Sequence, residues 1–325
     1  MAVLLLCLYL VPLPLFVEAP GPSRDVLPRI DVDGAPTYRT EGRLLLTTVN
    51  IGRVSAVYAI GAWLDPAATL VPERDIVPPG RTDRELEQLS LSQMDSSKIA
   101  AVAAALRRVT DYPRDRGRGV LVQAVFAQTP AATKLFAGDL ILAADGRAVR
   151  DPEHLRSLIR AAGTERSLRL AVMPVEGGER RRVEIRPARF PGEEDPIIGI
   201  VPVANFPFHV LIASGQIGGP SAGLMWALGL VDLLTPGDLT GGRTIAGTGE
   251  LDLEGGVHGI GGIRLKIRAA ADAGARVFLL PRDNLEEARG ADEGILLVPV
   301  ATLDEAVGFL EREISSRNDH NRNQG

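Results

Sequence analysis

Cysteine and lysine are scarce in this chain of 325 residues. The single cysteine, Cys7, excludes an internal disulfide, a zinc ribbon and an iron–sulfur site. The 36 basic residues include three lysines (Lys98, Lys134 and Lys266), so arginine supplies the other 33. None of these lysines is followed by Ser or Thr. A Walker A loop is therefore absent, and with it ATP hydrolysis of the P-loop type by these residues.

Histidines and aromatic residues are also few. The four histidines are scattered and form no HExxH pair, so the sequence predicts no metal site and no cofactor. An aromatic content of 4% and a net charge of −5 argue against a surface that binds nucleic acid. The length and the 45% hydrophobic content allow a buried core and two or three domains.

The N-terminal segment 1–20 is dominated by an uncharged apolar run over residues 2–17. As a helix this run would be about 24 Å long, shorter than the ~30 Å hydrocarbon core of a bilayer, and Pro12 and Pro14 interrupt it. It is interpreted as a membrane anchor that lacks upstream residues, or as a signal peptide cleaved near Ala19, with a buried core helix as the third reading. A membrane anchor predicts a single-pass protein of the cell membrane with an extracytoplasmic catalytic domain. A signal peptide predicts a secreted protein.

Four further segments complete the expected organisation. Residues 21–41 are rich in Pro, Gly and charge and are interpreted as a linker. Residues 42–115 form an α/β region, with a strand expected over 42–51 and a helix within 81–110. Residues 188–312 carry the glycine-rich motifs described below, and the polar tail 313–325 is expected to be disordered.

Residues 116–187 contain short apolar strands, a tight turn at Asp145-Gly146 and a helix expected at 152–162. This order of elements resembles a PDZ domain of the bacterial type. The resemblance places a carboxylate-binding loop at Gly117 and Gly119, with an adjacent strand edge that accepts an extended peptide. This edge would be formed by Val120, Leu121 and Val122. The alternative is a small β-domain that serves only as a spacer.

Ser221 is a candidate nucleophile. Gly219 and Pro220 precede it, and the apolar residues that follow recur at helical spacing. The serine is therefore expected at a helix N-terminus, beside backbone N–H groups that stabilise developing negative charge. Taken alone, the motif favours a serine that only caps the helix.

Lys266 is a candidate general base. On a helix that starts at Ile263, Arg264 and Arg268 define the wet face, and Lys266 points away from it among small apolar residues. A buried lysine can lose its proton, which arginine effectively never does. A neutral lysine beside a serine activates it without histidine. The alternative is a lysine whose aliphatic stem only covers apolar surface.

These two motifs resemble those of Lon-type peptidases. Gly219-Pro220-Ser221-Ala222-Gly223 matches the serine motif of that family, residues 261–266 match the lysine motif, and Thr248-Gly249-Glu250 matches the strand between them. The resemblance implies that Ser221 is the nucleophile and Lys266 the general base, with Thr248 orienting the lysine. It implies a weaker supporting role for His209, and Glu250 is either a supporting carboxylate or a surface residue.

The whole chain resembles the membrane-associated PDZ-Lon peptidases of bacteria, which lack an ATPase module. The expected fold is therefore mixed α/β (α+β): a Lon-type proteolytic domain, a PDZ-like β-rich domain and an N-terminal hydrophobic segment. Residues 42–51 and 96–112 also resemble the first strand and helix of a Lon-type domain, which would make the PDZ-like segment an insertion within that domain. The resemblance implies an ATP-independent serine endopeptidase with a Ser-Lys dyad, polypeptide substrates recruited or gated by the PDZ-like domain, and a hexamer-like homo-oligomeric ring. The alternative function is a non-catalytic exported scaffold that binds peptides.

Overall fold

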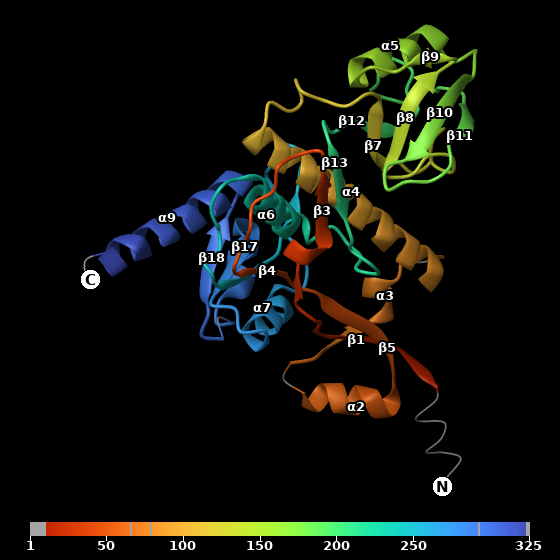
Figure 1. Cartoon of the computed structure of the whole chain (residues 1–325). Coiled ribbons are helices and arrows are strands. Elements are labelled where there is room, and N and C mark those ends of the chain that lie inside the picture. The colour runs from red at the N-terminus through yellow and green to blue at the C-terminus, as the bar shows by residue number, and fades with distance from the viewer. Residues whose placement is uncertain (1–10, 66, 79, 292, 323–325) are drawn as a thin grey trace.

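The fold is mixed α/β, with a larger α/β body and a smaller β-rich domain (Figure 1). The computed structural model describes residues 11–65, 67–78, 80–291 and 293–322. In Figure 1 the β-rich domain stands at the upper right, joined to the body where helix α4 ends and where strand β13 begins.

A five-stranded sheet forms the centre of the body. Its strand order is β18-β17-β14-β4-β2, and all neighbours are parallel except β2 and β4. The strands are β2 (Arg24–Asp25), β4 (Arg43–Leu46), β14 (Thr244–Gly247), β17 (Val277–Pro281) and β18 (Leu296–Val300). Successive side chains of a strand point to opposite faces, so Leu44 and Leu46 enter one core and Leu45 the other. A parallel strand that is covered on both sides therefore appears as an unbroken apolar run.

Helices cover both faces of this sheet. Helices α4 (Asp83–Val109) and α6 (Gly223–Leu234) pack against each other on one face, and α7 (Ile263–Asp272) lies on the other. The spacing of apolar residues predicted a helical stretch over 81–110, with Asp95 or Ser96 as its N-cap. The cap is wrong, because α4 begins at Asp83, where Thr82 and Glu85 form a capping box. Three further helices lie in the body: α3 (Glu73–Ile76), α8 (Leu285–Ala288) and α9 (Leu303–Arg322).

The β-rich domain has its own apolar core, distinct from the two cores of the body. Its sheet has the order β11-β10-β8-β7-β12, with β9 paired to β8. The elements are β7 (Val120–Val125), β8 (Asp139–Ala144), β9 (Arg147–Ala148), α5 (Pro152–Ala162), β10 (Leu168–Pro174), β11 (Arg181–Ile185) and β12 (Ile200–Ala204). Helix α5 has the bounds that the sequence predicted, with Asp151 as N-cap and Pro152 at the first position. Strand β12 lies beyond residue 187, the predicted end of this domain.

The N-terminal region forms a third sheet, with β1 (Pro12–Pro20) between β5 (Val49–Ser55) and β6 (Thr69–Pro72). Helix α2 (Ala56–Leu64) follows β5 directly. The readings of residues 2–17 as a helix do not hold over 12–17, which are extended, while residues 2–10 lie outside the described residues. In the described part of the chain, every helix is too short or too polar to cross a bilayer.

Three other expectations need correction. The predicted linker 21–41 contains β2, the 3-10 turn Leu27–Arg29 and β3 (Ile30–Asp33), and β3 pairs with β13 (His209–Ile212). The predicted strand 42–51 is two strands, β4 and β5, which belong to different sheets. Much of the tail that was expected to be disordered, residues 313–322, continues helix α9. Pairing with distant strands stabilises β2, β3 and β4, and local composition carries no trace of it.

Candidate active site

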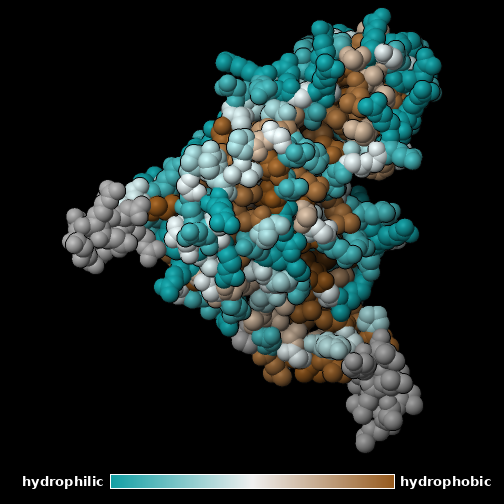
Figure 2. Space-filling view, viewed as in Figure 1, coloured by the Kyte–Doolittle hydropathy of each residue, from teal (hydrophilic) through white to brown (hydrophobic). Residues whose placement is uncertain are grey.

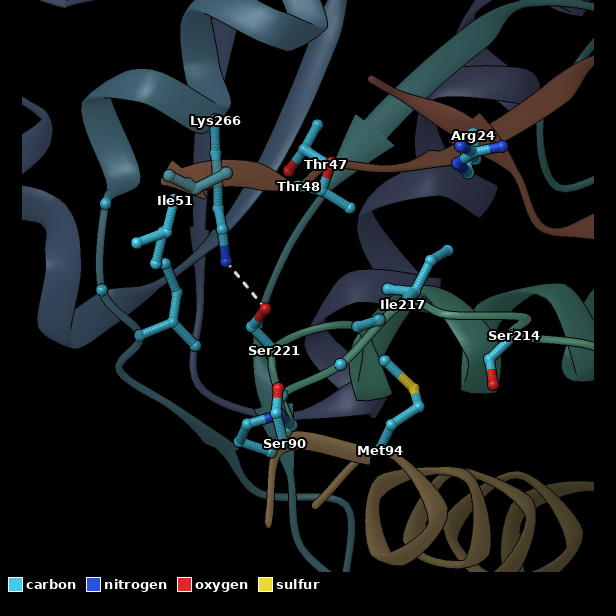
Figure 3. Close-up of a pocket in the computed structure, with 18 of the residues that line it drawn as sticks. Arg24, Thr47, Thr48, Ile51, Ser90, Met94, Ser214, Ile217, Ser221 and Lys266 are labelled. Carbon is cyan, nitrogen blue, oxygen red and sulfur yellow. Dashed lines mark hydrogen bonds between the residues drawn. The ribbon is translucent and has the colours of Figure 1, made fainter. Parts of the chain in front are cut away.

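A cleft of about 970 Å³ lies where the N-terminal sheet meets the body (Figure 3). Its walls come from four parts of the chain. They are the N-terminal strands (among them Glu18, Arg24 and residues 47–51), helix α4 (Ser90, Met94), the loop 214–222, and the segments that carry Glu250, Gly259–Gly262 and Lys266. Ser221 and Lys266 point toward each other inside this cleft.

Ser221 lies on a short loop two residues before helix α6. Gly219 has φ +80°, a conformation that residues with a side chain rarely adopt. Helix α4 holds this loop from below: the Gly219 N–H donates to the Ser90 carbonyl oxygen at 2.8 Å, and Ser97 Oγ donates to the Pro220 carbonyl oxygen at 2.8 Å. The serine is thus placed by backbone contacts on both of its preceding residues.

Lys266 reaches Ser221 from helix α7. Its Nζ lies 2.7 Å from Ser221 Oγ and 3.2 Å from Thr248 Oγ1, and the residue is 4% exposed. Burial lowers the pKa of Lys266 to about 8, because the charged ammonium loses its hydration. Near neutral pH a substantial fraction of this amine can therefore accept the Ser221 proton.

Thr248 connects the two residues. It is fully buried, and its Oγ1 donates to the Ser221 carbonyl oxygen at 2.9 Å while it accepts from Lys266 Nζ. The neighbouring Gly249 N–H also donates to the Ser221 carbonyl oxygen, at 2.8 Å. These contacts fix the backbone of the serine and leave its hydroxyl to the lysine.

The other buried lysine, Lys98, has the opposite electrostatics. Burial lowers its pKa, but hydrogen bonds to Asp95 and Glu176 outweigh that effect and raise the pKa above the ordinary value. Lys98 therefore stays charged and joins helix α4 to the β-rich domain. Lys266 has hydroxyl partners instead of carboxylates, which is why burial alone sets its pKa.

Two backbone amides next to Ser221 are available to bind an oxyanion. Within the described residues, the structure gives the N–H groups of Ser221 and Ala222 no hydrogen-bond partner. Both precede the first turn of α6, where the positive end of the helix dipole favours negative charge. A carbonyl oxygen that becomes negative beside Ser221 Oγ would be stabilised there.

The structure brings most of the predicted residues to this cleft. Gly219, Pro220 and Glu250 line it, and Glu250 is exposed at its edge. His209 is not among the residues around the cleft: its Nε2 lies 3.4 Å from the Val175 carbonyl oxygen of the β-rich domain.

Sequence reasoning missed the contributions of α4 and of the N-terminal region. Ser90 and Ser97 position the nucleophile loop from more than 120 residues away in the sequence. Arg24 and Arg29 place positive charge in the cleft, although their segment was interpreted as a linker. No local signal marks these residues, since each acts through a contact made only in the folded chain.

The predicted peptide-binding edge of the β-rich domain is already occupied. Strand β12 pairs antiparallel with β7 along its whole length, from Ile200 opposite Val125 to Ala204 opposite Val120. The Gly117 N–H, predicted to bind a terminal carboxylate, donates to the backbone carbonyl oxygens of Asn205 and Phe206. The edge of Val120, Leu121 and Val122 therefore faces an internal strand in this structure, and Gly119 lies next to β8. The expectation of a free edge is wrong for this conformation.

Comparisons with known protein families match two parts of the chain. The family described as the Lon protease (S16) C-terminal proteolytic domain matches residues 203–306, and the PDZ domain family matches residues 97–186. The chain thus contains a Lon-type proteolytic domain and a PDZ domain.

Several curated relatives are Lon proteases. Lon protease of Chloroflexus aggregans is 34% identical over 120 residues, which are 35% of this chain and 14% of the relative. Lon protease of Rickettsia bellii is 32% identical over 109 residues (32% and 14%), and Lon protease 2 of Bacillus subtilis is 32% identical over 105 residues (32% and 19%). The matched part of this chain thus spans less than a fifth of the length of these relatives.

Among solved structures, the PDZ domain of an SdrC-like protein from Listeria monocytogenes is 28% identical. The match covers 26% of this chain and 87% of the Listeria chain, with a TM-score of 0.24.

Proposed function

We propose that this chain is a serine endopeptidase in which Ser221 is the nucleophile and Lys266 the general base. The observation that carries the proposal is the 2.7 Å contact between Lys266 Nζ and Ser221 Oγ, made by a buried lysine whose pKa is lowered to about 8. The similarity to Lon proteases supports the same reaction class. The chain has arginine at 33 of its 36 basic positions, and arginine could not act as this base. The rare lysine at position 266 is therefore consistent with a role as the base.

The reaction proceeds in two halves. Neutral Lys266 accepts the Ser221 proton while Oγ attacks the scissile carbonyl carbon, and the resulting oxyanion lies against the N–H groups of Ser221 and Ala222. The Lys266 ammonium then gives its proton to the leaving amine, and the C–N bond breaks to form an acyl-enzyme. In the second half a water molecule gives a proton to neutral Lys266 as its oxygen attacks the ester carbonyl carbon. The Lys266 ammonium then returns the proton to Ser221 Oγ as the ester C–O bond breaks, which frees the carboxyl product and restores both residues.

Cleavage is expected to rise with pH as Lys266 loses its proton. Because burial lowers the pKa of Lys266 to about 8 in the folded protein, kcat/KM should increase about tenfold per pH unit well below that value and level off above it. The measurement is the rate of cleavage of a short unstructured peptide across the pH range, with far-ultraviolet circular dichroism as a check of folding. A rate that is independent of pH, or that falls as pH rises through 8, would contradict the assignment.

The competing function is a non-catalytic peptide-binding scaffold. It predicts no cleavage at any pH, together with binding of peptides by the PDZ domain. The proposed enzyme should instead cleave unfolded polypeptides without added nucleotide, because the 325 residues contain no Walker A loop. Attachment to a membrane through the N-terminal segment and assembly into a homo-oligomeric ring remain predictions from the resemblance.

The PDZ domain is proposed to gate the enzyme. Strand β12 lies on β7 in the direction of a bound peptide, with its C-terminal end at the carboxylate-binding loop. An external peptide must displace this strand, and an internal competitor acts at a high effective concentration. Only four residues separate β12 from β13, after which the chain enters the nucleophile loop. Release of β12 is therefore proposed to shift β13 and the loop that carries Ser221.

A disulfide between β7 and β12 is expected to slow cleavage of a long unfolded protein. In a Cys7→Ser background, Val125→Cys and Ile200→Cys place two cysteines on opposed positions. Opposed Cα atoms in antiparallel strands are about 4.5–5.5 Å apart, within disulfide range. The oxidised form should cleave at least about threefold more slowly than the reduced form, because opening then requires loss of a covalent bond.

The matched control joins two strands that the gate does not separate. Arg169→Cys and Glu184→Cys oppose each other on β10 and β11 of the same sheet. Oxidation of this pair should leave the rate unchanged. Equal rates for the oxidised and reduced forms of the β7–β12 pair would mean that β12 is a permanent part of the PDZ sheet.

A further inference from the structure

One wall of the cleft is a ladder of two antiparallel segments from the N-terminal region. At one end of the ladder Glu18 lies opposite Ile51, and at the other end Arg24 lies opposite Leu46. The pairing continues between these ends through β1 and β5 and through the backbone N–H of Gly21. Six residue steps from Glu18 to Arg24, at about 3.3 Å each, give the wall a length of at most roughly 20 Å. The wall is therefore about as long as an extended peptide of six residues.

Two arginines lie at one end of the cleft. In Figure 3, Arg24 and Ser214 are on the same side of Ser221. Arg29 also lines the cleft, and its Nη1 donates at 3.3 Å to the carbonyl oxygen of Ala213, the residue before Ser214. The Ala213 N–H donates back to the Arg29 carbonyl oxygen at 2.8 Å. Both guanidinium groups thus lie beside the start of the loop that carries the nucleophile.

These two positive charges are not neutralised by carboxylates of the cleft. The ion pairs within the described residues involve other arginines, and neither of these two takes part in one. The acidic group nearest in sequence, Asp25, accepts from the Leu27 N–H at 3.2 Å and does not line the cleft. The charge of Arg29 lowers the pKa of Asp25, but burial outweighs this effect and raises that pKa. Of the carboxylates that do line the cleft, Glu18 is at the far end of the wall and Glu250 is exposed at the edge.

We propose that Arg24 and Arg29 form an anionic subsite, which selects polypeptides with an aspartate or glutamate within about five residues of the scissile bond, on one side of it. This inference rests on the peptidase function proposed above. A guanidinium binds a carboxylate through two parallel N–H···O bonds, and it effectively never loses its charge. A lysine or arginine of the substrate at the same position is repelled. The other end of the wall carries Glu18 and therefore has no such preference.

The two arginines contribute in different ways. Arg24 is exposed on β2, which is an edge strand of its sheet, so its side chain is free to meet a substrate. Arg29 is half-buried and already oriented by Ala213, so less side-chain entropy is lost when it binds a carboxylate. The alternative is that Arg29 only holds the loop in place. That alternative predicts no dependence of cleavage on the charge of the substrate.

Matched peptides that differ at one position test the subsite. An unstructured peptide with one mapped cleavage site is prepared with aspartate, asparagine or lysine at each of the five positions before and after that bond. On one side of the bond, kcat/KM should be at least about fivefold higher with aspartate than with asparagine, and lower with lysine. On the other side the aspartate-to-asparagine ratio should be close to one. An increase in ionic strength from about 0.05 to about 0.5 M should reduce the preference, because salt screens exposed charges.

Arginine variants assign the preference to these side chains. Arg24→Glu should make lysine the preferred residue. Arg29→Lys keeps the charge and should keep most of the preference, whereas Arg29→Gln should lower the aspartate-to-asparagine ratio. A loop-holding role alone would lower kcat/KM for both peptides and leave their ratio unchanged. The control, Arg147→Glu, changes an exposed arginine of β9 in the PDZ domain, whose outer surface carries many hydrophilic side chains (Figure 2), and it should keep the wild-type ratio.

Binding to an inactive variant separates this proposal from the peptidase assignment. Ser221→Ala should bind the labelled aspartate peptide at least about fivefold more tightly than the asparagine peptide, as measured by fluorescence anisotropy. Preferential binding without cleavage by the wild type would support the subsite and contradict the peptidase function. Cleavage by the wild type with a ratio of one at every position would overturn the subsite and leave the peptidase function standing. An unchanged ratio in Arg24→Glu would also overturn the subsite.

Discussion

Replacement of Ser221 with alanine is expected to reduce peptide cleavage by about a thousandfold or more. The variant removes Ser221 Oγ, the hydroxyl oxygen that lies 2.7 Å from Lys266 Nζ and that is proposed to attack the substrate. Oxyanion stabilisation and substrate binding would remain, and they account for a residual rate above that of the uncatalysed reaction. The measurement is kcat/KM for an unstructured peptide at a pH above 8, where the wild type is most active.

Folding and specificity controls make this result decisive. The Ser221 hydroxyl contributes one hydrogen bond, so its loss should cost only about 1 kcal/mol and leave Tm almost unchanged. Ser157→Ala, at a serine of helix α5 far from the cleft, should cleave at the wild-type rate. A fluorophosphonate should label the wild type and Ser157→Ala but not Ser221→Ala. Full turnover or labelling by Ser221→Ala would exclude the proposed nucleophile and favour the scaffold.

Replacement of Lys266 with arginine is expected to cause a loss of similar size, about a thousandfold, despite the conserved charge. Arginine effectively never loses its proton in proteins, so it cannot accept the Ser221 proton. The rise of activity toward pH 8 should disappear as well, which a merely structural lysine would not predict. The measurement is the pH profile of kcat/KM for both proteins.

Two further variants exclude misfolding as the cause. Lys266→Met removes the base but fills the same apolar space, and it should fold at least as well, because a buried amine is replaced by a neutral side chain. Lys98→Arg changes the other buried lysine, whose partners are Asp95 and Glu176, and arginine can keep both ion pairs. Lys98→Arg should therefore stay active. If Lys266→Arg kept more than a tenth of the wild-type rate, Lys266 would not be the base.

Helical segments were the most predictable part of this fold. The spacing of apolar residues marked the stretch that contains α4, and residues 152–162 were predicted with the bounds of α5, because such periodicity acts within a few turns. The N-cap predicted at Asp95 or Ser96 was wrong, since α4 begins at Asp83. The same local reasoning placed Lys266 on the dry face of α7, and the structure finds it buried. Side-chain periodicity suffices there, since a helix fixes which residues share a face.

Strand partners were the least predictable part. Residues 12–20 appear in the sequence as an apolar run with two prolines, yet they form the central strand of the N-terminal sheet. Strand β12 lies within 188–312, which the sequence predicted to be the proteolytic domain. In the structure it pairs with β7 and occupies the edge of the PDZ sheet where a peptide was expected to bind. A strand is stabilised by hydrogen bonds to residues that are distant in the sequence, and a single sequence does not name those partners.

The sequence by itself pointed to the chemistry proposed for this protein. None of the three lysines lies in a Walker A loop, and Lys266 was predicted on an apolar helix face, where burial allows a lysine to lose its proton. Tertiary structure decided the rest: the 2.7 Å approach of Lys266 to Ser221, the burial that lowers the lysine pKa to about 8, and the internal strand on the PDZ edge. Distance, desolvation and strand pairing arise between residues far apart in the chain, so they exist only once it has folded.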